Sequence, residues 1–248
     1  MRTLILMGCG IVAAGLSGCA LDAGRTPASA AGDSTFDFTA QQFVTLYNGR
    51  TAKCDDKTVF NDQGCVDKVK SIRVVADEAT LSMDDSNFQV AVRELKRLGL
   101  VEGKIAFDAK LRLGLAKNGL VKSISITGSP RDLANWSSTL GMVALVYELL
   151  NPGFTEESEH QFLNPLVDLV TPAFTAESKQ HFLAPLYELV NPESTAKSEQ
   201  QFLAPLGHPA IGHPMTNVSP GGAFACNARR SSGSLEFGCV IVPHRPPR

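Results

Sequence analysis

The chain has 248 residues, of which 44% are hydrophobic, and its formal net charge is −2. No block of Lys or Arg stands out, so the electrostatic footprint of a nucleic-acid-binding protein is missing and we expect no nucleic acid as a partner. The length suits one medium-sized domain with appendages, or two small domains.

The N-terminal segment Met1–Gly18 has the features of a secretory signal peptide. Arg2 precedes an apolar run that ends at Leu16, and small residues precede Cys19. This run is too short to span a membrane, which takes about 20 apolar residues. The segment Leu16-Ser17-Gly18-Cys19 resembles the lipobox of bacterial lipoproteins. The resemblance implies cleavage before Cys19, attachment of diacylglycerol to its sulfur and N-acylation; the alternative is an ordinary secretory signal with a chance cysteine.

The residue after the lipobox cysteine bears on the location. In the lipoprotein family an Asp there holds the protein at the inner membrane, and this chain has Ala20 instead. The resemblance therefore implies a lipid anchor at Cys19 in the outer membrane, facing the periplasm, with the inner membrane and the cell surface as alternatives. Residues 19–34 are rich in Ala, Gly, Ser and Thr and predict a flexible tether.

Residues 35–132 are predicted to form an α+β domain in which a helix packs on an antiparallel sheet. The expected elements are a helix at Thr39–Asn48 ended by Gly49, a strand in Ser71–Met83, a helix from Ser86 to Leu98, and strands at Ile105–Leu115 and Leu120–Thr127. The last two alternate apolar and polar residues, and Asn118-Gly119 between them is a two-residue hairpin signal. A strand through Phe88–Val92 remains the alternative to the second helix.

The cysteines indicate an oxidising compartment. One of the six leaves with the signal and a second is Cys19, so four remain, which allow three pairings. We expect the pairs Cys54–Cys65 and Cys226–Cys239, because they lie far apart in sequence and each closes a short loop. A zinc site of four thiols is not expected, because the paired Cys-x-x-Cys spacing is missing.

Two further groups of side chains have the chemistry of metal ligands: Asp55, Asp56, Asn61 and Asp62, and further along the chain His208 and His213. The first group offers oxygen ligands to calcium, but its spacing differs from that of an EF-hand loop. The two histidines have no third ligand nearby and lie in residues 207–222, which we interpret as a Pro/Gly linker. We therefore expect no metal and no cofactor.

Residues 133–206 are predicted to be helical and contain a tandem repeat. The 20-residue copies are residues 147–166, 167–186 and 187–206, and eight positions are the same in all three. A period of this length signals stacked units, so we expect a three-unit helical array docked by an apolar helix in Leu133–Leu150. Pro165 either kinks the first unit or restarts its helix. The array is either a binding surface or a spacer.

Residues 223–248 predict a disulfide β-hairpin and a tail. If Cys226 lies opposite Cys239, the turn centres on Ser232-Gly233, a two-residue hairpin signal, so the pairing and the turn agree. The expected fold is therefore α+β: a helix packed on an antiparallel sheet, then the three-unit helical repeat, then a C-terminal disulfide hairpin.

No sequence motif of catalysis is present. The chain lacks a Gly-x-Ser-x-Gly elbow, a His-Glu-x-x-His pair, a phosphate-binding loop and a dinucleotide fingerprint. We assign no catalytic residue and interpret the pairs Asp55-Asp56 and Asp84-Asp85 as surface charge, although they are acid/base candidates. The favoured hypothesis is a lipid-anchored envelope protein with a non-catalytic binding or structural role and an envelope protein as partner. The alternatives are an envelope hydrolase that uses unrecognised carboxylates, and a carrier of a small apolar ligand.

Overall fold

The computed structural model describes residues 34–55, 65–130, 132–153, 155, 162, 165–166, 214–231 and 234–244. Several features predicted above lie outside the described residues: the signal segment, Cys19, nearly all of the tether, Asp56, Asn61 and Asp62, the second and third repeat copies, His208, His213 and the Ser232-Gly233 turn.

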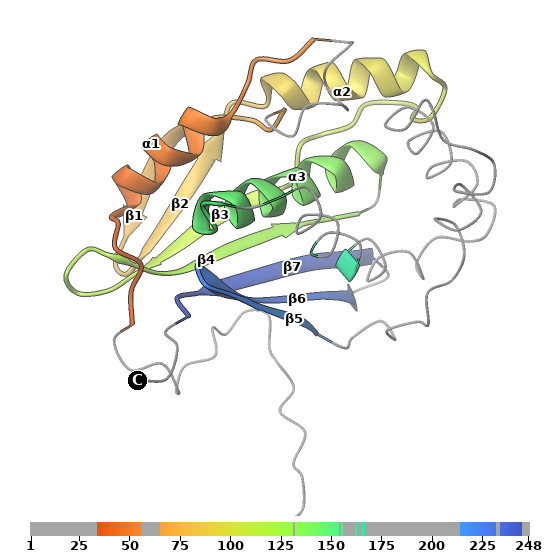
Figure 1. Cartoon of the computed structure of the whole chain (residues 1–248). Helices are drawn as coiled ribbons and strands as arrows, with labels where there is room; N and C mark the ends of the chain where they lie inside the picture. Colours follow the sequence, from red (N-terminus) through yellow and green to blue (C-terminus); the bar gives the residue numbers. More distant parts are fainter. Residues whose placement is uncertain are drawn as a thin grey trace, which may run out of the picture. The chain divides into compact units, whose positions relative to one another are not determined.

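The described chain is built on one seven-stranded antiparallel sheet (Figure 1). Its strands are β1 (Val69–Val75), β2 (Glu78–Met83), β3 (Lys110–Leu115), β4 (Val121–Gly128), β5 (Met215–Ser219), β6 (Gly222–Ser231) and β7 (Ser234–Val242). Their order across the sheet is β1-β2-β3-β4-β7-β6-β5, so β1 and β5 form its two edges. Because β7 pairs with β4, the C-terminal hairpin extends the sheet formed by the first four strands.

Alternation along the strands explains which face of the sheet is buried. In β3, Leu111 and Leu113 are buried while Lys110 and Arg112 are exposed. Paired residues in an antiparallel sheet share a face. The register across β4, β7, β6 and β5 therefore places one row on the buried face: Ile126, Cys239, Cys226 and Met215.

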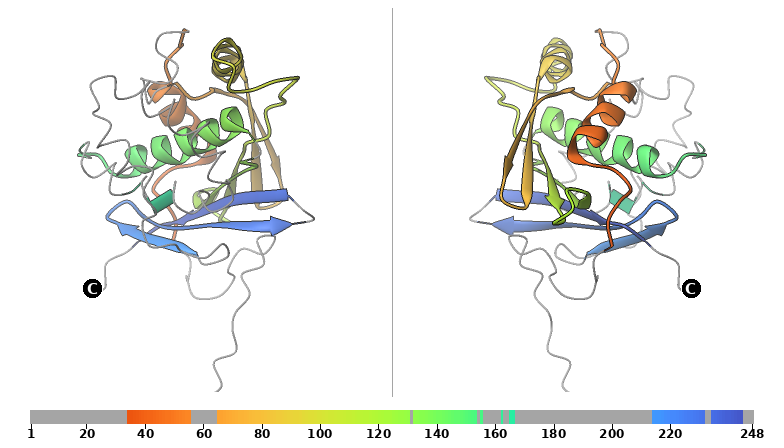
Figure 2. Two further views of the ribbon diagram at one scale, coloured as in Figure 1. Left: turned by 90° about the vertical axis from the view of Figure 1, so that its right-hand side faces the viewer. Right: turned by 90° about the vertical axis from the view of Figure 1, so that its left-hand side faces the viewer.

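In the described part of the chain, three helices accompany the sheet: α1 (Ala40–Arg50), α2 (Ser86–Arg97) and α3 (Leu133–Leu150). Figure 2 shows α1 and α3 on the same side of the sheet, with α2 beside them. Thr39 and Gln42 form a capping box at the start of α1. Helix α3 lies so close to β4 that a Cβ at Gly128 would overlap the hydroxyl of Thr139, and this approach requires glycine.

The predicted fold class is wrong in its second half. The structure is sheet-rich with three short helices, and no three-unit helical repeat occurs among the elements described. The expected apolar helix in Leu133–Leu150 is confirmed as α3, which includes Tyr147, the first residue of the first copy. Phe162, which recurs in all three copies, stacks on Tyr147 with ring centroids 3.9 Å apart and contacts Phe224 of β6. These aromatic residues therefore complete the core of the sheet and do not serve as an interface between repeats.

The hairpin and both disulfides are confirmed, and Cys226 lies directly opposite Cys239. Within the first region, the helix from Ser86 is confirmed and the alternative strand is wrong. The single strand expected in Ser71–Met83 is two strands, because Ala76 adopts a positive φ of 52° and reverses the chain. The expected strand in Ile105–Leu115 begins only at Lys110.

Strand β3 begins later than predicted because a side chain of α3 binds the backbone of the residues before it. The side chain of Asn135 accepts a hydrogen bond from the backbone N–H of Asp108 at 3.0 Å and donates one to the carbonyl of Ala106 at 2.9 Å. These two backbone groups are thus bound by a helix side chain. The apolar alternation before Lys110 therefore continues without becoming part of the sheet.

Candidate functional site

The outer edge of β1 is the candidate functional site. Strand β1 pairs with β2 on one side only, so the backbone N–H and C=O groups on its other side face away from the sheet. At the start of the strand, Asn48 of α1 binds this edge: its Nδ2 donates to the carbonyl of Val69 at 2.9 Å, and the N–H of Val69 donates to its Oδ1 at 2.8 Å. Beyond Val69, no other element in the described parts of the chain hydrogen-bonds to this edge.

The side chains of β1 are mostly exposed. Val74 and Val75, which point to opposite faces because they are neighbours in a strand, are 55% and 60% exposed. The strand and the residue before it carry three exposed cations, Lys68, Lys70 and Arg73, and no acidic side chain. In the part of the chain that the structure describes, the candidate site is therefore an unpaired, basic strand edge whose side chains are exposed on both faces at its C-terminal end.

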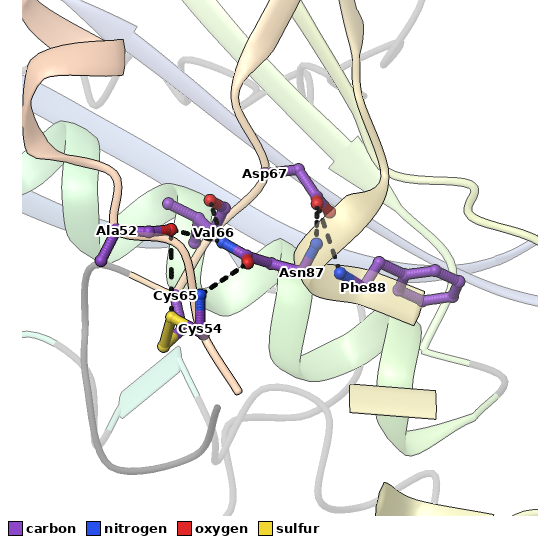
Figure 3. Close-up of a disulfide and its surroundings, with 7 residues drawn as sticks. All are labelled: Ala52, Cys54, Cys65, Val66, Asp67, Asn87 and Phe88. Carbon is purple, nitrogen blue, oxygen red and sulfur yellow. Dashed lines mark hydrogen bonds between the residues drawn. A yellow bond between two sulfur atoms is a disulfide. The ribbon is translucent and has the colours of Figure 1, made fainter. Parts of the chain in front are cut away.

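A buried polar cluster fixes the position at which β1 begins (Figure 3). Asp67 is 2% exposed, and its Oδ1 accepts hydrogen bonds from the backbone N–H groups of Asn87 at 2.7 Å and Phe88 at 3.2 Å. Both groups belong to the first turn of α2, whose amides have no partner inside the helix. Since the N-cap residue Asp85 makes no side-chain capping bond, Asp67 caps α2 from a distant part of the chain.

Asn87 joins the cluster to the first disulfide (Figure 3). Its side-chain amide donates to the carbonyls of Ala52 at 2.8 Å and Val66 at 3.0 Å, and its Oδ1 accepts from the N–H of Cys54 at 3.1 Å. The disulfide then links Cys54 to Cys65, with their Cα atoms 5.7 Å apart. The segment that enters β1 is thus held by α2 and the disulfide, while Asn48 of α1 holds the strand's first residue.

Burial in and beside this cluster raises the pKa values of two side chains, Asp67 and Tyr47. Burial raises the pKa of Asp67 to about 6, the bonds from Phe88 and Asn87 oppose this rise, and the nearby carboxylate of Asp84 adds to it. Burial also raises the pKa of Tyr47 far above its ordinary value, again with contributions from Asp67 and Asp84. The hydroxyl of Tyr47 is buried and has no hydrogen-bond partner among the residues described.

The geometry of the cluster is that of a structural support. A carboxyl group with a pKa near neutrality can act as a general acid. Asp67, however, is only 2% exposed, and the hydrogen bonds that it accepts from Asn87 and Phe88 hold α2. The pair Asp84-Asp85 also shapes the backbone, because Asp84 accepts from the N–H and hydroxyl of Ser86, and Asp85 accepts from the side chain of Gln89.

The predicted site residues fall into separate regions. The four disulfide cysteines form two bonds in different parts of the sheet domain, and Cys19 lies outside the described residues. Within the described ranges, no group of three or more His, Cys, Asp or Glu side chains could hold a metal ion. In the same ranges, no helix combines the length and apolar character needed to cross a membrane.

Sequence reasoning did not identify Asn48, Asp67 or Asn87 as site residues. Asn48 lies in an ordinary amphipathic helix, and its two bonds to Val69 connect residues 21 positions apart. The one available signal was the carboxylate of Asp67, which directly follows the apolar residue Val66 and lies two positions before β1 begins.

A comparison of the chain with protein-family models, with curated proteins and with solved structures found no match in any of the three.

Proposed function

We propose that this chain is a lipid-anchored protein of the cell envelope that binds a partner protein without catalysis. The observation that carries the binding role is the open edge of β1. Natural sheets usually cover, shorten or twist such an edge or line it with charged side chains, because an unpaired row of backbone groups recruits other strands. Strand β1 carries cations and a register shift between Val69 and Ser71, but no described strand pairs with its outer side. Here hydrogen bonds to Asp67, Asn87 and Asn48 hold the chain where β1 begins, while no described element pairs with the outer edge of the seven-residue strand.

The proposed attachment to the membrane is supported by the lipobox-like segment that ends in Cys19. The tether after it is compatible with a binding domain that stands away from the bilayer. The proposal places the anchor in the outer membrane and the domain in the periplasm. The two alternatives have less support, since the carboxyl group of Asp67 is enclosed and the apolar face of the sheet is packed against helices.

The anchor is tested by metabolic labelling with an alkyne fatty acid. Wild-type chain should incorporate the label and fractionate with outer membranes, whereas Cys19→Ser should remain unlabelled and unprocessed. Cys9→Ser is the matched control, because that cysteine lies inside the signal segment and should leave labelling unchanged. Equal labelling of wild type and Cys19→Ser would refute the lipid anchor.

The binding role is tested by chemical crosslinking in intact cells, followed by purification through a C-terminal tag. We expect one or more envelope proteins to be recovered with the wild-type chain and to be lost when the domain is unfolded by removing both disulfides. A tagged subunit of a known envelope complex, expressed at the same level, is the positive control. If that subunit is recovered with its partners and the wild-type chain is recovered alone, the binding role is refuted.

A further inference from the structure

We propose that the outer edge of β1 receives an extended, acidic segment of the partner protein, which adds to the sheet as an eighth strand. This inference rests on the proposed binding function and specifies the surface and the chemistry of the ligand. It is carried by three independent features of β1: its backbone, its apolar side chains and its charge.

The backbone feature is the pairing that Asn48 already makes. Its side-chain amide binds both the C=O and the N–H of Val69, and a directly opposed residue of an antiparallel strand would make the same pair of bonds with its own N–H and C=O. The side-chain amide of Asn48 thus takes the place of one residue of a neighbouring strand. The free edge of β1, residues 70–75, begins directly after the residue that it binds. An incoming strand would continue this row of hydrogen bonds along the rest of the edge.

The apolar feature is the pair of valines at the end of the strand. Val74 and Val75 are more than half exposed on opposite faces, although β-branched residues in strands are ordinarily packed against neighbours. A strand added beside β1 would lie next to both valines, because its own side chains alternate between the same two faces. Apolar residues at alternating positions of the ligand share one face and would therefore pack against one of these two valines.

The charge feature selects an acidic ligand. Lys68, Lys70 and Arg73 make no ion pair with any other described residue, whereas two cations of the inner strands do: Arg112 pairs with Glu78 and Lys122 with Asp77. Carboxylates on an incoming strand would face these cations at cross-strand distances. Two copies of β1 would instead bring cations against cations, so a second copy of this chain is the wrong occupant.

The test uses the mature chain and two peptide probes. The first is a short capped peptide that alternates Val with Glu; the second alternates Val with Lys at the same positions. At about 50 mM salt, where charges a Debye length apart still interact, we expect the Glu peptide to bind at least ~10-fold more tightly, and the ratio to shrink at high salt. Amide hydrogen exchange of the complex should slow in residues 70–75 and not in the opposite edge, β5.

Matched variants assign the effect to β1. Arg73→Glu should weaken the preference for the Glu peptide, because Lys68 and Lys70 then face one carboxylate, whereas Lys104→Glu, the same charge change at an exposed loop position away from the strands, should preserve it. The proposal is overturned by equal affinities for the two peptides, by protection at β5 alone, or by a preference that Arg73→Glu leaves unchanged. Self-association of the wild-type chain through β1 in sedimentation would also overturn it.

The inference and the proposed function fail in different ways. If crosslinking in cells recovers a partner whose yield is the same with wild type and Arg73→Glu, the binding role stands and the edge assignment is wrong. If the wild-type chain recovers no partner, the proposed function itself is wrong.

Discussion

Replacing Asp67 by Asn is the sharpest test of the buried cluster. Burial raises the pKa of this carboxyl from 3.8 to about 6 in the folded protein. The folded state therefore binds a proton that the unfolded state has released between these two pH values. Stability is lost as the pH rises from about 4 through about 6, and the loss is complete above the folded pKa.

The size of the effect follows from the shift. One pKa unit corresponds to about 1.4 kcal/mol, so a rise of roughly two units costs the folded protein about 3 kcal/mol at neutral pH. Both amides of α2 bind the same oxygen of Asp67, Oδ1, and the carbonyl oxygen of an asparagine can accept both. Asp67→Asn should therefore remove the cost of the charge and keep the cap.

Urea unfolding of the wild type and Asp67→Asn from pH 4 to pH 7.5 measures this directly. We expect equal stability near pH 4 and a variant more stable by up to about 3 kcal/mol at pH 7.5. Asp37→Asn, at an exposed position, is the control and should change stability by less than about 0.5 kcal/mol throughout. A variant that is less stable than wild type at pH 7.5 would show that the charged carboxylate binds α2 strongly enough to outweigh its burial, and would refute the reasoning.

Three further variants test single contacts by urea unfolding at neutral pH. Tyr47→Phe should stabilise the protein by about 1 kcal/mol, because it removes a buried hydroxyl without a partner; a loss of that size would reveal a bond to this group. Ala76→Gly should stabilise by roughly 0.5–1 kcal/mol, since the positive φ of 52° favours glycine, and an unchanged midpoint would contradict this. Gly128→Ala should destabilise by about 1–3 kcal/mol and be partly rescued by Thr139→Ala; no rescue would exclude the overlap as the cause.

The local features of the fold could be predicted because their causes are local. The capping box at Thr39 lies within one helical turn, and the alternation in β3 lies within one strand. The disulfide between Cys226 and Cys239 could be predicted because a single hairpin brings the two residues together. Each of these features depends on residues that are close in sequence.

The pairing of β7 with β4 could not be predicted in this way. It places Ile124 opposite Ile241, and nothing near either residue specifies a partner so distant in the chain. The repeat misled for a related reason. Similar sequence in three copies suggests three similar units, but the first copy places Phe162 against Tyr147 and Phe224 of the sheet domain. The surroundings of Phe162 are set by the hydrophobic core of the sheet domain. The 20-residue period of the sequence contains no information about that core.

The buried cluster and the open edge are consequences of the same arrangement. A strand that binds another chain through its backbone must be ordered before the ligand arrives, because ordering it on binding would reduce the affinity. If β1 binds a ligand strand, its outer side must stay free. No neighbouring strand can therefore order the segment before β1 from that side. Asp67, Asn87 and the Cys54–Cys65 disulfide order it from the side of the helices instead. On the proposal that the free edge of β1 binds a partner, the enclosed carboxyl of Asp67 helps to order the start of that strand at a cost in stability at neutral pH.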